Sequence, residues 1–314
     1  MDARRKRHLK RSLKLAPYLL VLLMSGGYAL VEHNIDSKEQ AKIEEIKDDI
    51  IEDNNESISE NSIPAKEETQ VIVKEEPLEE EPVEQESVEE VKVTYSSELL
   101  DSGYEFETID FDILKQINDS ASAWIKIDGT NIDYPIVTGS DNEYYLHHDI
   151  EGNKSKSGTL FTDFRNNPLD DEKLNDITFI YGHHMKGGKM LAQICNYKDE
   201  NFYKEHDFGV VYTPDGYAYK ITPLSCIVVD GNDEAETFVT NFENQTTYMN
   251  YIKKINEQSK IETNTCVKPG DKLLALVTCS YETTNSRCIV YFKMEKQYTN
   301  INQIENNVNK TLNR

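Results

Sequence analysis

The sequence is poor in positive charge and in cysteine. Lysine and arginine total 34 against 57 acidic residues, so the 314-residue chain has a formal net charge of −23 at pH 7. Because nucleic-acid binding depends on cationic side chains that neutralise phosphates, this balance argues against nucleic acid as a main partner. The five cysteines are an odd number, so at least one lies outside any intramolecular disulfide. Outside the cell, this favours a thiol with a chemical role over a full disulfide framework.

The sequence also lacks the ligand spacing of a metal site. The pairs His183-His184 and His147-His148 are adjacent, and no Cys or His pair at zinc-ligand spacing accompanies them. We therefore expect no metal and no cofactor, and we interpret His147-His148 as part of a loop. Four cysteines are interpreted as small packed side chains: Cys195, Cys226, Cys266 and Cys288.

One long uncharged run lies near the N-terminus. Residues 1–14 are strongly basic, and residues 15–31 carry no charge. Seventeen residues is the short end for a membrane-spanning helix, which needs about 17–25. The basic flank should stay in the cytoplasm and place the rest of the chain outside. A cleavable signal peptide is the rival interpretation, but no small-x-small cleavage site follows the run, which favours a single-pass anchor.

An acidic tract follows, without aromatic residues. Residues 37–94 are rich in glutamate and carry prolines at positions 64, 77 and 82. Such a segment buries too little apolar surface to offset its chain entropy, so residues 32–95 are predicted to be a disordered stalk. Apolar residues near helical spacing over residues 41–51 indicate no more than a transient helix.

Residues 96–300 are predicted to form one folded domain, followed by a tail over residues 301–314. Helical spacing occurs within residues 97–122, with Phe111, Leu114 and Ile117 on one face, and over residues 190–206 and 234–259. The remaining apolar runs have strand length and are separated by turn residues. These eight runs cover residues 124–127, 132–137, 158–163, 176–181, 208–213, 217–229, 273–277 and 288–292. Eight strands with short turns predict a closed antiparallel or mixed barrel.

Three reactive residue types stand at strand ends. Cys279 follows the run over residues 273–277 after Thr278, and Arg287 directly precedes the run over residues 288–292. A nearby guanidinium can favour a thiolate and can hold the oxyanion that forms when the thiolate attacks a carbonyl. The run over residues 176–181 leads into Gly182-His183-His184, which supplies an acid/base. Neighbours on a strand face opposite ways, so one of the two histidines is expected to face the thiol.

The order His, Cys, Arg resembles the sortases, most closely class B, over residues 111–294. The family's Thr-Leu-x-Thr-Cys signature is present as Ala275-Leu276-Val277-Thr278-Cys279, with alanine in place of the first threonine. The stretches WIKIDGTNIDYPIV, DNEYYLHHD and IYGHHM are also similar to class B members. The resemblance implies a mostly β (α+β) fold, the sortase-type eight-stranded β-barrel with N-terminal helices and an inserted helix before the cysteine-bearing strand.

The resemblance also implies the roles of individual residues. The catalytic histidine follows Tyr-Gly directly, which selects His183 as acid/base, with Cys279 as nucleophile and Arg287 as clamp for the oxyanion and the substrate backbone. The class B groove maps onto Asn142, Leu146, Thr247, Tyr251, Ile252, Val277, Thr278 and Ser280. Each of these groove residues has core or surface packing as an equal alternative.

The function implied is that of a membrane-anchored cysteine transpeptidase. It would cleave the C-terminal sorting signal of a surface protein after threonine, often an Asn-Pro-x-Thr type in class B, and form a thioacyl enzyme. An amino group of a peptidoglycan precursor or cross-bridge would then accept the chain. Two alternatives stay open: a cell-wall cysteine peptidase that only hydrolyses, and a non-catalytic surface protein that binds peptides. Papain-like peptidases place Cys before His and at a helix start, unlike this chain.

Overall fold

The computed structural model describes residues 37–51, 99, 102–169, 173–230, 237–280 and 285–297. The basic segment over residues 1–14, the predicted anchor over residues 15–31, most of the predicted stalk and the tail over residues 301–314 lie outside the described residues. Within the described ranges, no helix combines the length and the apolar character needed to cross a bilayer.

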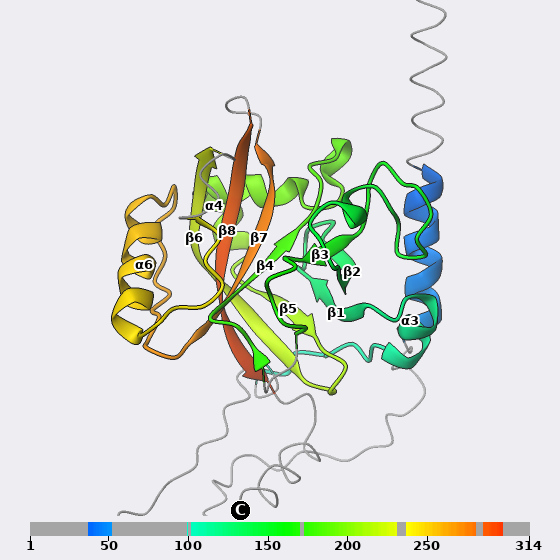
Figure 1. Cartoon of the computed structure of the whole chain (residues 1–314), viewed down its shortest axis with the longest axis horizontal. Helices are drawn as coiled ribbons and strands as arrows, with labels where there is room; N and C mark the ends of the chain where they lie inside the picture. Colours follow the sequence, from blue (N-terminus) through cyan, green and yellow to red (C-terminus); the bar gives the residue numbers. More distant parts are fainter. Residues whose placement is uncertain are drawn as a thin grey trace, which may run out of the picture. The chain divides into compact units, whose positions relative to one another are not determined.

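In this part of the chain eight strands close into a barrel, in the order β1-β2-β3-β4-β7-β8-β6-β5 (Figure 1). The strands are β1 (Ala121–Lys126), β2 (Asp133–Thr138), β3 (Leu160–Thr162), β4 (Ile177–Tyr181), β5 (Gly209–Tyr212), β6 (Ala218–Asp230), β7 (Lys272–Ser280) and β8 (Ser286–Gln297). The pairs β2–β3 and β4–β7 are parallel, whereas β1–β2, β3–β4 and β7–β8 are antiparallel. The predicted mixed barrel is confirmed.

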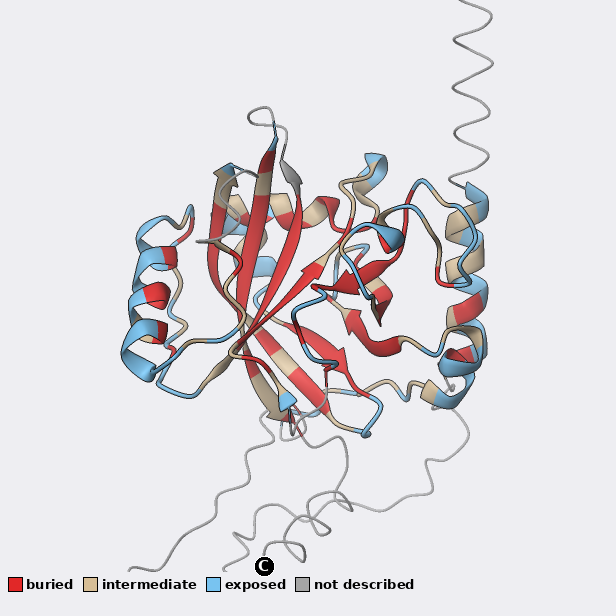
Figure 2. Cartoon of the chain, viewed as in Figure 1, coloured by how far each residue is buried: buried red, intermediate tan, exposed pale blue. Residues whose placement is uncertain are grey.

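Apolar residues on both faces of the central strands build two cores. Leu274 and Leu276 of β7 belong to the cluster inside the barrel, whereas Ala275 and Val277 belong to a second cluster that includes Tyr251 of α6 (Gln245–Glu257). Successive strand residues point to opposite faces, so a strand covered on both faces is apolar throughout. Figure 2 shows buried positions along the strands and on one side of α6, whose other side is exposed.

Two helices differ from their predicted extents because polar residues cap them. The helix predicted over residues 234–259 begins later, since the Asn244 carboxamide accepts a hydrogen bond from Thr247 N at 3.0 Å and forms a capping box there. The single helix predicted over residues 190–206 is divided into η5 (Ala192–Lys198) and α4 (Glu200–Glu205). Asp199 separates them, because its carboxylate accepts from Asn201 N and Phe202 N and so starts a new helix.

Other short helices of the described residues lie before β1, between β2 and β3, and between β4 and β5. These are α3 (Phe111–Ile117), η2 (Tyr144–Leu146) and η4 (Lys186–Gly188). Asp110 caps α3, and of the three residues expected on its inner face Leu114 is fully buried.

The prediction of disorder is wrong for residues 37–50, which form a helix, called here the N-terminal helix. Ile46 and Ile50 are buried, and Ile43 packs against the barrel core. In Figure 1 this helix lies beside α3, on the side of the barrel away from α6. Spacing of three and four residues puts these isoleucines on one face, so the short segment buries apolar surface that its acidic composition conceals.

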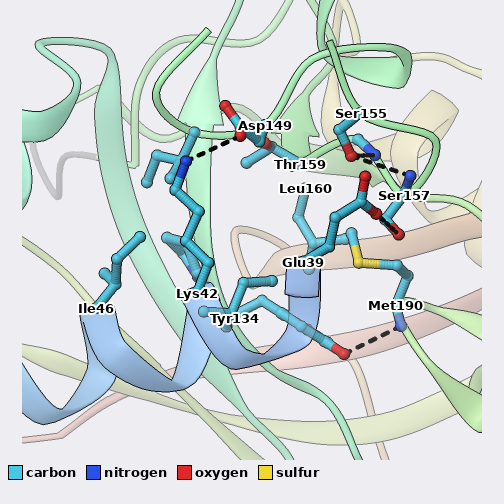
Figure 3. Close-up of a pocket in the computed structure, with 14 residues that line it drawn as sticks. Glu39, Lys42, Ile46, Tyr134, Asp149, Ser155, Ser157, Thr159, Leu160 and Met190 are labelled. Carbon is cyan, nitrogen blue, oxygen red and sulfur yellow. Dashed lines mark hydrogen bonds and ion pairs between the residues drawn. The ribbon is translucent and has the colours of Figure 1, made fainter. Parts of the chain in front are cut away.

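Polar contacts hold the N-terminal helix in place. Lys42 pairs with Asp149 at 3.2 Å, Lys47 pairs with Asp133 at 2.6 Å, and Ser157 donates to Glu39 at 2.6 Å. Figure 3 shows Glu39 and Lys42 reaching the loop that carries Asp149 and Ser157, around a cavity of about 40 Å³. Tyr134 lines the same cavity and accepts a hydrogen bond from Met190 N at its hydroxyl. The helix therefore belongs to the folded domain and not to a stalk.

A second compact unit comprises residues 53–106 and 297–314, of which few are described. Within it, Leu99 N donates to the Gln297 carboxamide at 3.2 Å, and Tyr104 N donates to Leu99 O at 2.9 Å.

Candidate active site

The register of β7 and β8 pairs Cys279 with Arg287. The antiparallel ladder runs without interruption from Lys272↔Met294 to Ser280↔Ser286, and Cys279 and Arg287 are direct partners in it. Residues directly opposite each other in such a pair lie on the same face of the sheet, with Cβ atoms about 4.5–5.5 Å apart. Position 279 therefore adjoins Arg287 because of the sheet register alone.

The β4–β7 pairing brings His183 to the same end of the barrel as Cys279 and Arg287. The parallel register sets Tyr181 opposite Val277. It continues beyond β4, because Gly182 N donates to Val277 O at 3.2 Å and the Thr278 hydroxyl donates to Gly182 O at 2.8 Å. The residue after Gly182 is His183, and the residue after Thr278 is Cys279. His183, Cys279 and Arg287 thus stand at one end of three neighbouring strands.

Gly182 is required by close packing. A Cβ atom at this position would lie 2.3 Å from Leu160 Cδ2 and 2.9 Å from Leu191 Cγ. The end of β4 therefore packs beside Leu160 and Leu191 only without a side chain at position 182. This explains physically why a glycine precedes His183.

The His183 ring is held by a backbone carbonyl. Its Nε2 lies 2.7 Å from Leu146 O at the end of η2. A carbonyl oxygen can only accept, so Nε2 carries a proton and Nδ1 is the nitrogen left for proton exchange. The ring centroid lies 6.2 Å from that of His147, in the segment that follows η2.

His184 lies on a different side of the chain. Its backbone bridges to Met190, and its Nδ1 lies 3.6 Å from Cys195 Sγ. The two adjacent histidines therefore contact different neighbours, Leu146 for His183 and Cys195 for His184. This supports His183 as the acid/base. Among the residues described, no group of three or more His, Cys, Asp or Glu could hold a metal ion.

Arg287 is half-buried, and its guanidinium donates to the neighbouring Ser286 O at 3.3 Å. Within the described ranges, no carboxylate forms an ion pair with it. A guanidinium held on a strand can bind carbonyl oxygens or an oxyanion through two parallel N–H donors.

Two other cysteines have environments unsuited to a nucleophile. Cys226 and Cys288 are fully buried in the barrel core. A contact with the Cys195 thiol acts to lower the pKa of Cys288, but a contact with the Cys226 thiol and burial outweigh it and raise that pKa above its ordinary value. Since the thiolate is the reactive form, burial and a raised pKa disfavour Cys288 as a nucleophile. Cys266 is exposed, so the prediction that its side chain is packed is wrong, and Cys195 is half-buried beside His184.

The predicted groove residues fall into two groups. Leu146 and Asn142 lie on the segment that supports His183: Leu146 supplies the carbonyl, and Asn142 donates to Asp163 at 3.1 Å. The others lie on α6 and β7. The second core buries Val277, Tyr251 and Ile252. Thr278 is buried and donates its hydroxyl to Gly182 O, and Thr247 belongs to the capping box of α6. Ser280 is the strand partner of Ser286. Contact of these residues with substrate stays a prediction.

A closed mixed barrel with histidine, cysteine and arginine at one end of neighbouring strands defines the class of cysteine transpeptidases called sortases. The sequence matches the model of the Sortase domain family over residues 125–295, which is more than half of the chain. The chain belongs to the sortase family.

The relatives are of class B. The chain is 33% identical to sortase B of Listeria monocytogenes over 172 residues, 54% of this chain and 66% of that protein. It is 30% identical to sortase B of Staphylococcus aureus over 189 residues, 59% of this chain and 75% of that protein. A crystal structure of Clostridium perfringens sortase B is similar with a TM-score of 0.56 and 34% identity, covering 59% of this chain and all of that one. These similarities place the chain in class B.

Proposed function

We propose that this chain is a membrane-anchored transpeptidase that joins surface proteins to an amino group of the cell wall. The observation that carries the proposal is the register that pairs Cys279 with Arg287 while Thr278 is tied to the residue before His183. In the proposal, Cys279 as nucleophile, Arg287 as oxyanion clamp and His183 as acid/base lie together at one end of the barrel.

The proposed reaction has two halves. The Cys279 thiolate attacks the threonine carbonyl of a sorting signal, and Arg287 binds the oxygen that becomes negatively charged. His183 gives a proton from Nδ1 to the departing amine, and the C–N bond breaks to leave a thioester. An incoming amine then gives a proton back to Nδ1, attacks the thioester and releases the Cys279 thiolate.

The relatives support these partners. Solved structures of Staphylococcus aureus sortase B include a complex with a substrate, and another solved sortase B structure is a complex with triglycine. We propose that this chain likewise binds a sorting-signal peptide and an amine acceptor. A peptidoglycan precursor or cross-bridge supplies such an amine at the outer face of the membrane.

The proposed location is the cell membrane, with residues 15–31 as a single-pass anchor, residues 1–14 in the cytoplasm and the barrel outside. A basic flank before an uncharged 17-residue run supports this orientation. Full-length protein should remain in the membrane fraction after a high-salt wash, and a chain lacking residues 1–31 should not. Recovery of the full-length chain in the culture medium would disprove an uncleaved anchor.

The test of activity uses full-length protein in detergent and a panel of peptides that includes Asn-Pro-x-Thr sequences. Mass spectrometry should detect a thioester on Cys279 and, with an added amine, a transfer product. Cys279→Ala should abolish both, whereas the exposed control Cys266→Ser should keep them. Equal product with and without amine would indicate hydrolysis only, and peptide binding without cleavage would indicate a non-catalytic binding protein.

A further inference from the structure

Asp163, directly after β3, is a fully buried carboxylate that the proposed mechanism does not use. Both of its oxygens accept several hydrogen bonds. Oδ1 accepts from Arg165 N at 2.9 Å and from Arg165 Nε at 2.8 Å; Oδ2 accepts from Arg165 Nη2 at 2.7 Å, Tyr181 OH at 2.9 Å and Asn142 Nδ2 at 3.1 Å. A buried carboxylate with this many donors is ionised and fixed in place.

Two of these donors belong to the two supports of His183. Tyr181 is the last residue of β4, two positions before His183. Asn142 begins the segment that ends at Leu146, the residue whose carbonyl accepts from His183 Nε2. The Asn142 carboxamide is held at both ends, because its oxygen accepts from Phe164 N at 3.0 Å while its nitrogen donates to Asp163. One carboxylate therefore connects the strand that carries His183 with the segment that orients its ring.

The far end of that segment is also fixed. Thr159 N donates to Tyr145 O at 2.9 Å, and a Cβ at Gly158 would lie only 2.4 Å from Tyr145 O and 2.8 Å from Leu146 O. Gly158 also has φ of +64°, which other residues adopt with strain. With Asn142 tied at one end and Tyr145 at the other, the Leu146 carbonyl has little freedom to move away from His183.

We propose that Asp163 is a positioning residue that holds His183 with Nε2 protonated toward Leu146 O and Nδ1 toward the reacting groups. The proposal rests on the proposed function, in which His183 exchanges protons at Nδ1. In Asp163→Asn one of the two acceptor oxygens becomes an NH₂ donor, so the side chain can no longer accept from both Arg165 and the pair Tyr181 and Asn142. We expect the Leu146 carbonyl to shift and the neutral His183 ring to populate both tautomers. Only the Nε2–H tautomer has a lone pair on the nitrogen used for catalysis.

The test compares Asp163→Asn with Asp176→Asn in the full-length protein. Asp176 is a matched control, because it lies just before the other end of β4 and its carboxylate also joins separate segments, accepting from Phe242 N at 2.9 Å and Lys272 Nζ at 2.9 Å. Two quantities are measured: the ¹⁵N chemical shifts of the His183 ring at a pH where it is neutral, which report the tautomer, and kcat and KM for peptide transfer.

In the wild-type protein and in Asp176→Asn, the shifts should indicate the Nε2–H tautomer. In Asp163→Asn they should indicate a mixture, and kcat should fall by about 10- to 100-fold, the scale on which misplacement of a catalytic group acts, with KM changed far less. Wild-type ring shifts in Asp163→Asn would overturn the proposal. Equal changes in both variants would also overturn it, because they would indicate general destabilisation.

Two milder variants apply if Asp163→Asn does not fold. Asn142→Ala and Tyr181→Phe each remove one donor and leave the Arg165 contacts intact. Each should shift the tautomer part of the way, and wild-type shifts in both would refute the positioning role. The ring shifts do not depend on turnover. Full transfer by His183→Ala would disprove the proposed function. The ring shifts of His183 in the wild-type protein and in Asp163→Asn would still decide the role of Asp163.

Discussion

The two halves of the candidate site are built by different means. On one side, Cys279 and Arg287 are direct partners in an uninterrupted antiparallel ladder between β7 and β8. On the other, His183 lies beyond the last residue of β4, and its position depends on Gly182 packing, the Thr278–Gly182 hydrogen bond and the segment anchored by Asp163. A ladder sets which residues are neighbours, but an imidazole also needs an orientation and a tautomer, which only surrounding side chains supply.

The largest expected effect is on the histidine half. His183→Ala should lower transfer kcat by about 10² to 10⁴, the usual contribution of a general acid/base. The adjacent control His184→Ala should change kcat far less, because His184 contacts Cys195 and not Leu146. Peptide-transfer kinetics with both variants measure this. A larger loss in His184→Ala would mean that the acid/base is the other histidine.

The second largest effect is expected from a substitution at Arg287. Arg287→Lys keeps the charge but loses the planar fork, so transfer kcat/KM should fall by about 10² to 10³, the cost of one oxyanion donor. The rate of Cys279 alkylation by a small thiol reagent should stay near that of the wild-type protein, since a nearby cation remains. Wild-type transfer in Arg287→Lys would leave Arg287 as a general electrostatic neighbour.

Gly182→Ala tests the packing that places the end of β4 beside Cys279 and Arg287. The added methyl group collides with Leu160 and Leu191, so the free energy of unfolding should fall by roughly 1–3 kcal/mol, as for other overpacked cores. Transfer kcat should fall as well. Gly209→Ala is the control, because Gly209 lies on β5, away from His183, and a Cβ there would lie 2.8 Å from an Ile127 side-chain atom. It should lower the free energy of unfolding and spare kcat, measured by urea denaturation and transfer kinetics.

The smallest effect concerns pH. Burial acts to raise the pKa of Asp163, but hydrogen bonds from Arg165 and Tyr181 outweigh it and hold that pKa below its ordinary value. A carboxyl whose folded pKa is depressed stabilises the fold above its unfolded pKa, about 3.9, and this stabilisation is lost as the pH falls through the folded value.

In Asp163→Asn, the free energy of unfolding should therefore fall less steeply than in the wild-type protein as the pH drops below about 4. Denaturant midpoints measured between about pH 3 and pH 7 check this. An identical acid profile in both proteins would mean that Asp163 does not bind its proton more weakly in the folded state.

Strands and their pairing partners were predictable where residues close in the sequence determine them. The runs around Cys279 and Arg287 are joined by a short connection, so antiparallel pairing follows from adjacency in sequence, and the pairing sets the two residues opposite each other. The uninterrupted apolar runs of β7 and β8 follow from burial on both faces. Helix ends were less predictable, because Asn244 and Asp199 act only through hydrogen bonds to specific backbone groups.

By itself, then, the sequence determined the barrel, the reactive residue types and their places at strand ends, because these depend on periodicity and on short connections. The tertiary structure alone decided the parallel pairing of β4 with β7, in which Thr278 bonds to Gly182, 96 residues earlier in the chain. It decided the docking of the N-terminal helix, in which Lys42 bonds to Asp149, 107 residues later. It also decided that Asp163 gathers Asn142, Arg165 and Tyr181. Such contacts join residues distant in the chain, and their free energy depends on geometry and desolvation that no local pattern records.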